Sequence, residues 1–381
     1  MSIDRTQDHT SRLILRHVLR HVLRFARAVE SLTTRPLALY GSAVLRIGYG
    51  LAFLAYLVRE FPNREELWGP TAAWTPAMAH QYAQTMDWYG WTKSWYTLLA
   101  TTDDVRFQLS YDFALLVCLA MVLGFRTRLT AVLFLLVVTT FTGRDAFLGD
   151  GGDNVMTLMA IYLAFLASGR CLSLDGRRRA KRAASASAAA HDPALRPAAG
   201  VRAEWGELRR RAVNVMHNAA VFVVGFQMCV IYGAAGLWKA QGHLWQNGTA
   251  MYYVLHIDWF QPWPGLSGLV AGDSIGICAI AYVTVFMQIG FPFAIFTKRL
   301  KYVVLVVLLG MHIGIAVLLG LPVFSLVMVV GDSVFLPDAF WRAAGERVRV
   351  LVAPRRTGRA APATVPGIRP ARPKIGSVLE H

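Results

Sequence analysis

One lysine ends a long apolar run in the second half of the chain. The stretch VFVVGFQMCVIYGAAGLWKAQGHLWQNG, residues 221–248, holds Lys239 as its only lysine or arginine. Removal from water disfavours a charged ammonium, and a neutral amine can act as a general base. The alternative is a snorkelling lysine, whose ammonium lies among lipid headgroups while its stem covers apolar surface. These residues alone leave both interpretations open.

Asp153 and His256 are second candidates for contact with a ligand or substrate. Asp153 lies in GRDAFLGDGGDNVM (143–156), whose carboxylates lack the regular spacing of a calcium-binding loop. A tight turn in which Asp153 or Asn154 caps the following helix is the favoured interpretation. His256 lies in the aromatic stretch YYVLHIDWF.

Four further polar side chains fall inside apolar runs, where each has a structural explanation. We expect Arg46 to pair with Asp112. His217 and His312 are expected to be neutral imidazoles bonded to backbone carbonyls. Neither histidine has a partner at metal-ligand spacing, so no metal is predicted.

These candidates sit in a chain whose composition is typical of membrane proteins. Of 381 residues, 55% are hydrophobic and 16% are charged, and the mean hydropathy is +0.42. The net charge of +16 could indicate a nucleic-acid partner, but the 39 lysines and arginines cluster in blocks between apolar runs. This distribution favours a lipid bilayer and no nucleic acid. The fold class predicted is an all-α polytopic membrane bundle.

About eight transmembrane helices are predicted, since a span needs roughly 20 mostly apolar residues. The third, fourth and eighth are short. The predicted spans are approximately Leu37 to Val58, Leu109 to Phe125, Leu129 to Thr142, Asn154 to Ser168, Val213 to Trp238, Ile275 to Phe296, Tyr302 to Leu319, and Pro322 to Phe335.

The basic blocks predict topology and domain organisation. If all eight segments cross, the blocks fall on the cytoplasmic side, so both termini are expected in the cytoplasm of a multi-pass protein of the cell membrane. Segments 1–36 (a basic amphipathic helix or a solvated one), 170–212 (a basic linker) and 339–381 (a basic tail) flank two halves, 37–169 and 213–338. Much of the linker and the tail are predicted to be disordered. Tryptophans at 61–96 and 238–263 favour the outer membrane interface, with a ligand pocket as the alternative.

The order of motifs resembles a known family. The segments LRIGYGLAFL, GFRTRLTAVL, LGDGGDNVMTLMAIYLAFLASGRCLSLD, YGAAGLWKAQGHLWQNGTAMYYVL and MHIGIAVLLGLPVFSLVMVVGDSVFLP together resemble the HTTM membrane-domain family, which includes the vitamin K-dependent gamma-carboxylases. The resemblance covers about 37–337, and the segment ending in LSLD and the AGLWK segment are its most specific parts.

The resemblance implies a role for Lys239. In the carboxylases the matching lysine deprotonates vitamin K hydroquinone, and the oxidised quinol drives proton removal from a protein glutamate that takes up carbon dioxide. The implied cofactor is a reduced quinone of the vitamin K or menaquinone type, with Trp238 and Trp245 at the mouth of its pocket. The implied substrate is a protein or small molecule.

Two other functions stay open at this stage. Members of the wider family resemble the membrane factor that matures a secreted sporulation-delaying peptide, so maturation of, or immunity to, an antimicrobial peptide is an alternative. The other is a non-catalytic lipid- or quinone-binding membrane protein.

Overall fold

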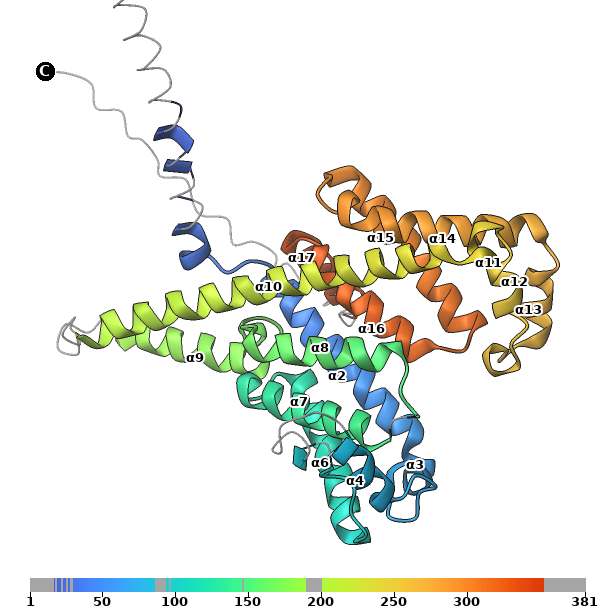
Figure 1. Ribbon diagram of the computed structural model, residues 1–381. Coiled ribbons are helices and arrows are strands. Elements are labelled where there is room, and N and C mark those ends of the chain that lie inside the picture. Colours follow the sequence, from blue (N-terminus) through green and yellow to red (C-terminus); the bar gives the residue numbers. More distant parts are fainter. Residues whose placement is uncertain are drawn as a thin grey trace, which may run out of the picture. The chain divides into compact units, whose positions relative to one another are not determined.

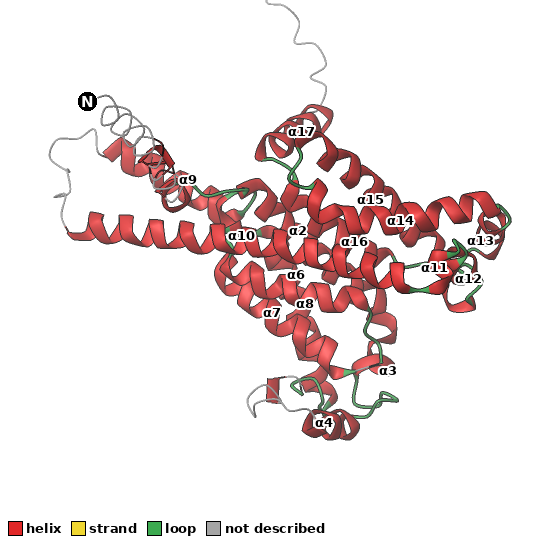
Figure 2. Ribbon diagram, turned by 45° about the horizontal axis from the view of Figure 1, so that its top comes forward, coloured by secondary structure: helices red, strands yellow, loops and turns green. Residues whose placement is uncertain are grey.

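A computed structural model describes residues 30–85, 94–95, 97–145, 147–189 and 201–352, with a few isolated positions between 17 and 27. Within these residues all regular structure is helical, and there is no strand (Figure 2). The described residues up to Arg342 belong to one compact unit. The predicted all-α class is confirmed.

Among the described residues, six helical segments are long and apolar enough to cross a membrane, or seven if one bent pair counts as a span. The chain is therefore a multi-pass helical bundle. The six segments are Leu39–Trp68, which comprises α2 (Leu39–Glu60), a 3₁₀ turn and α3 (Arg64–Trp68); α6 (Asp104–Leu123); α7 (Thr127–Arg144); Ala203–Gln241 of α10 (Val201–Gln241); α14 (Ser274–Ala294); and α15 (Lys298–Leu318).

The remaining predicted spans are shorter helices. α8 (Gly151–Phe165) has 15 residues, and α16 (Pro322–Asp332) has 11. These lengths fall below the roughly 20 residues of a full span, which is why the length criterion gives six or seven segments rather than the eight predicted. Both helices are nevertheless central to the packing, since α16 contacts α2, α8 and α15 (Figure 1).

Two segments predicted to be disordered are partly helical. In the linker, α9 (Leu174–Ala189) is a helix, because its alanines and arginines are strong helix formers. The tail begins with α17 (Asp338–Val352), so its first part is also helical. Most of the predicted amphipathic helix at 12–30, and the tail from 353 onward, lie outside the described residues.

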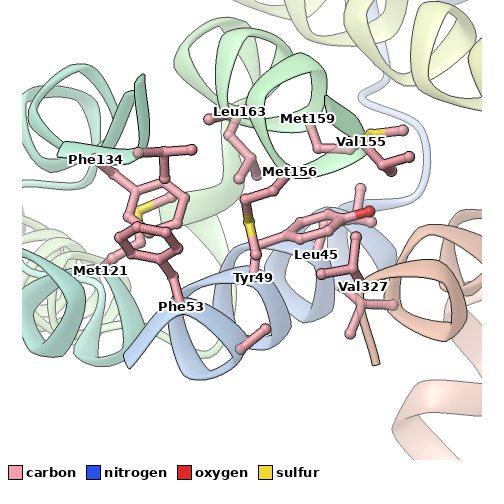
Figure 3. Packing of buried hydrophobic residues seen from close by; sticks show 14 of the residues in the cluster. Leu45, Tyr49, Phe53, Met121, Phe134, Val155, Met156, Met159, Leu163 and Val327 are labelled. Carbon is pink, nitrogen blue, oxygen red and sulfur yellow. The ribbon is translucent and has the colours of Figure 1, made fainter. Parts of the chain in front are cut away.

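The first half of the bundle has a closely packed core of large side chains. Phe53 of α2 makes edge-to-face contacts with Phe134 and Phe141 of α7, at centroid distances of 6.0 and 6.1 Å. Trp68 is only 1% exposed, and the centroid of its ring lies 5.3 Å from that of Phe141. Figure 3 shows the neighbouring part of this core, where methionines of α8 pack against Tyr49. Trp68 is thus buried in protein rather than at a membrane interface, a correction to the prediction.

Arg46 does not pair with Asp112, and that prediction was wrong. Its guanidinium is fully buried and donates to the carbonyl oxygens of Met121, Val122 (2.8 Å) and Leu172 (2.6 Å). Arg46 is level with the end of α6, where the last carbonyls lack helical partners. Asp112 lies further back in α6 and accepts a bond from Gln108 instead. The structural role expected of Arg46 is confirmed.

The turn between α6 and α7 is held by α9. Gly124 ends α6 with φ 69°, and a Cβ there would lie 2.4 Å from the Cβ of Ser173, so only glycine fits. Asp175 caps α7 by accepting from the amides of Arg126 (3.1 Å) and Thr127 (2.8 Å). Burial by itself raises the pKa of Asp175, but these hydrogen bonds and that from the Thr127 hydroxyl together outweigh it and hold the pKa below its usual value. The LSLD motif therefore has a structural function.

α10 is joined to the segment that precedes α2. His217 contacts the Leu37 carbonyl through Nε2 (2.7 Å) and accepts from the Ala167 amide through Nδ1 (3.1 Å), so the backbone-bonded imidazole predicted for it is confirmed. Asn214 donates to the Thr33 carbonyl (3.0 Å). Lys301 similarly donates to the carbonyl of Phe335 (3.1 Å).

Hydrogen bonds thus gather the basic segments at one end of the bundle. The turns at residues 126 and 172, α10 at residues 214–218 and the start of α17 at Asp338 are each bonded to α2, to the segment before it or to one another. A one-sided distribution of basic residues is what a membrane protein of fixed orientation requires.

Candidate functional site

A large apolar cavity lies in the second half of the bundle. Its volume is about 690 Å³, within the range of about 300–1,000 Å³ common for small-molecule sites. Most of the wall comes from α10, α14, α15 and α16, and most of the lining side chains are aliphatic. The polar or amphipathic exceptions are Tyr232, Lys239, Trp245, Thr284, Gln288 and His312.

α10 contributes a stripe of three residues to this cavity. Tyr232, Ala235 and Lys239 are spaced by three and four residues, so they project from the same helical face. The Cα atoms of Tyr232 and Lys239 are separated by roughly 10 Å along the helix axis, at about 1.5 Å per residue. α10 therefore places one polar group deep in the cavity and another near its own C-terminus.

Lys239 lines the cavity without a counter-charge. Its side chain is half-buried, and its Nζ lies 5.5 Å from the centroid of the Trp245 ring on α11 (His243–Gln246). Its side chain has no hydrogen bond or ion pair with another described residue. Trp245 also lines the cavity, whereas Trp238 is 75% exposed and does not. The structure thus brings together Lys239 and Trp245, but not Trp238.

A buried polar cluster borders the same cavity. The Tyr232 hydroxyl donates to Asp332 Oδ2 (2.8 Å) and lies 3.0 Å from His312 Nε2. All three side chains are buried, and His312 Nδ1 and Asp332 Oδ1 have no hydrogen-bond partner. The Oε1 atom of Gln288 on α14 is likewise buried and unpaired. Buried polar atoms are usually paired, and two of these three atoms belong to residues that line the cavity, His312 and Gln288.

The prediction that His312 bonds to a backbone carbonyl was wrong, because its partner is Tyr232. Sequence reasoning also passed over Tyr232 and Asp332. Two signals were available: Asp332 is a carboxylate within a predicted span, and Tyr232 precedes Lys239 by seven residues, two helical turns. Nothing in the sequence places Asp332 beside Tyr232, from which it is 100 residues distant.

Asp153 lies at a different place, the start of α8. Its carboxylate accepts from the amide of Asp150 (2.8 Å), and the Asp150 carboxylate accepts from Gly152 (2.6 Å) and Asp153 (3.3 Å). This reciprocal pair is a capping box. The prediction that Asp153 or Asn154 is the cap was therefore wrong: Asp150 is the cap, because the helix begins earlier than its apolar run.

Asp153 nevertheless lines a second cavity of about 410 Å³, with Arg59, Glu60 and Asp150. Phe324 of α16 lines both this cavity and the apolar one described above. Asp153 is thus separated from Lys239 by the wall that the two cavities share.

His256 lines neither cavity, although the preceding residue, Leu255, lines the apolar one. His256 is exposed, its Nδ1 contacts the Tyr252 carbonyl (2.7 Å), and its ring lies 4.2 Å from that of Tyr252. Within the described residues, no group of three or more His, Cys, Asp or Glu side chains is arranged to hold a metal ion.

Comparisons with models of protein families, with curated proteins and with solved structures found no significant match to this chain.

Proposed function

We propose that this multi-pass membrane protein is an enzyme that binds a reduced quinone of the vitamin K or menaquinone type in its apolar cavity, with Lys239 as the general base. The observation that carries this proposal is the position of Lys239. An amine without a counter-charge lines an apolar cavity of about 690 Å³, and unpaired ionisable groups within a bundle are expensive and therefore tend to be functional.

The chemistry follows from these surroundings. A quinol is apolar enough to enter from the bilayer, and the Trp245 ring offers its head a flat surface for stacking. Transfer of a phenolic proton to Lys239 leaves an ammonium beside a phenolate, a pair that attracts strongly where water is excluded. The ammonium also faces the ring of Trp245, 5.5 Å away. We propose this transfer as the first step of a carboxylase-type reaction in which dioxygen oxidises the quinol and the oxidation is coupled to modification of a protein or small-molecule substrate.

The buried cluster supplies hydrogen bonds for polar atoms of the ligand. His312 and Gln288 line the cavity and carry unpaired buried atoms. Because the Tyr232 hydroxyl donates to Asp332, it accepts from His312 Nε2, and Nδ1 of the neutral imidazole is an acceptor. A quinol hydroxyl can therefore donate to Gln288 Oε1 or to His312 Nδ1. Tyr232 and Asp332 fix the position of the imidazole through its Nε2 side. The proposed ligand thus has partners near both ends of the α10 stripe.

We also propose that the protein resides in the cell membrane with both termini in the cytoplasm. The convergence of the basic segments at one end of the bundle supports this orientation. A reporter fused after Lys374 is expected to be active on the cytoplasmic side only. A reporter active outside the cell would mean an odd number of crossings.

The enzyme proposal is tested with purified protein in lipid, in aerated buffer, supplied with reduced vitamin K or menaquinone. Consumption of quinol and formation of epoxide are compared between wild type and Lys239→Ala. The matched control is Lys298→Ala, which removes an exposed lysine outside the cavity. Loss of a general base lowers the rate by about 10²–10⁴-fold, and the control is expected to keep the wild-type rate.

The possible outcomes separate the candidate functions. Turnover that is equal in the wild type and Lys239→Ala would remove Lys239 from the mechanism. Quinone binding without turnover in either protein would replace the enzyme with a quinone-binding protein. If neither binding nor turnover occurs with any quinol, the quinol proposal is overturned and maturation of a secreted peptide becomes the function to test.

A further inference from the structure

Another large cavity, different from the two described above, lies at the basic end of the bundle and is lined by six arginines. It has a volume of about 700 Å³ and lies between the start of α7, the 3₁₀ turn η2 (Ser168–Arg170), α9 and α10. Segments from four parts of the chain converge here, so arginines that are distant in the sequence become neighbours in space. They are Arg126, Arg128, Arg170, Arg179, Arg209 and Arg210.

The positive charge of this arginine pocket is largely unbalanced. The only acidic residue in its lining is Asp175, whose carboxylate is occupied by the cap of α7. Arg210 pairs with Glu207. The side chains of Arg126, Arg128 and Arg209, by contrast, have neither a hydrogen bond nor an ion pair to any described residue. The pocket therefore holds guanidinium groups that lack anionic partners.

Arg170 is affected by the positive charges of the neighbouring arginines. Its Nη1 donates to Asn214 Oδ1 (2.6 Å), which holds the side chain in place. Burial lowers the pKa of Arg170, and the positive charges of Arg179, Arg128 and Arg210 lower it further. Like charges held this close repel one another, and an anion among them would reverse the sign of that interaction.

The pocket also has an apolar wall, formed by Leu129, Leu166 and Val213. Leu129 is 52% exposed on a membrane-spanning helix, so the pocket opens beside lipid-facing surface. Arginine binds phosphate oxygens through paired hydrogen bonds. Aliphatic side chains make no favourable contact with a free phosphate, but they do with the apolar part of a lipid. We propose that the arginine pocket binds the phosphate headgroup of an anionic membrane lipid, whose glycerol and acyl chains lie against this wall. The proposal is independent of the quinol chemistry.

The test measures lipid affinity of the full chain in an uncharged detergent. Phosphatidylglycerol is titrated and its retention followed by native mass spectrometry, with zwitterionic phosphatidylcholine as the reference lipid. The double variant Arg128→Gln/Arg209→Gln removes two of the three arginines without partners. We expect about 25-fold weaker binding of phosphatidylglycerol, or about fivefold for each arginine, which corresponds to about 1 kcal/mol per basic residue.

The matched control is Arg177→Gln/Arg182→Gln, which removes the same charge from α9 outside the pocket. We expect it to bind phosphatidylglycerol within about twofold of the wild type, because general attraction changes little. An equal loss of phosphatidylglycerol affinity in both double variants would mean that only the net charge matters, and it would overturn the proposed binding site. Displacement of the lipid by glycerol phosphate at the same concentration would assign the pocket to a soluble phosphate and overturn the lipid proposal.

Discussion

Cationic side chains lie in apolar surroundings in both halves of the bundle, but their hydrogen-bond partners differ between the halves. In the first half, Arg144 is 0% exposed and donates to the carbonyl oxygens of Trp68 (3.2 Å), Gly69 (3.1 Å) and Trp74 (2.7 Å). Arg46 is enclosed by carbonyls in the same way. In the second half, Lys239 faces a cavity and an aromatic ring. A guanidinium tied to three carbonyls joins segments of the fold, whereas an untied amine is free to react.

The packing differs in the same direction. In the first half, apolar side chains of α2, α6, α7 and α8 form a closely packed core, although a cavity of about 540 Å³ lies along α6 and α7. The second half leaves about 690 Å³ open between α10 and α14–α16. Protein interiors are normally close-packed, and an apolar space of this size is within the range of small-molecule sites. The contrast between the halves therefore rests on Lys239, which lines this space without a counter-charge.

The largest expected effect is on stability when a buried arginine is removed. Arg46→Met removes the donor from the carbonyls of Val122 and Leu172, whereas the carbonyl of Met121 still accepts from the Gly124 amide. At about 1 kcal/mol or more for each carbonyl left without a donor, the free energy of unfolding should fall by at least about 2 kcal/mol. Lys239→Met is expected to change it by no more than about 0.5 kcal/mol. Denaturant titration in detergent, followed by near-UV circular dichroism, measures both. Equal losses would make Lys239 a structural residue and end the contrast between the halves.

The buried arginines also mark the limit of sequence reasoning. Apolar runs predict the helices, because burial and length requirements are local. The partner of Arg46 depends on the position of α2 along the axis of α6. In the structure this position brings backbone carbonyls, and not Asp112, within hydrogen-bond distance of Arg46. Lys239 could be singled out by its position in the sequence. The cavity and the Tyr232–Asp332 bond could not, since they arise where helices distant in sequence meet.

A second comparison concerns two buried tyrosine hydroxyls. Tyr111 in the first half donates one hydrogen bond, to the Leu57 carbonyl (2.6 Å), so Tyr111→Phe should cost about 1 kcal/mol. Tyr232 bonds both a buried carboxylate and a histidine, and Tyr232→Phe should cost about 2–3 kcal/mol, since hydrogen bonds to charged groups are stronger. Tyr232→Phe should also weaken quinone binding, which Tyr111→Phe should not. Thermal unfolding and quinone titration measure the pair, and unchanged quinone affinity in Tyr232→Phe would exclude the cluster from the site.

Enlarging one alanine in each half tests whether the space is filled or open. Ala52 of α2 is 0% exposed, so Ala52→Leu is expected to overpack the core and cost about 1–3 kcal/mol. Ala235 lines the cavity, so Ala235→Leu should leave stability within about 0.5 kcal/mol of the wild type. It should instead reduce quinone affinity, because the added methyl groups occupy ligand space. If Ala235→Leu destabilised the protein as much as Ala52→Leu, the second half would be as closely packed as the first.

The smallest effect concerns the hydrogen bonds of the Asp175 carboxylate to the start of α7, and it depends on pH. Because the pKa of Asp175 is held below its usual value, its carboxylate stabilises the fold at neutral pH, and this contribution is lost as the pH falls below about 4 toward the folded-state pKa. Asp175→Asn should therefore lower the free energy of unfolding by at most about 1 kcal/mol at pH 7, since the group is partly solvated. The difference from wild type should narrow in acid. Unfolding titrations at several pH values between 3 and 7 follow it, and a difference that stayed constant down to pH 3 would mean that Asp175 acts through shape rather than charge.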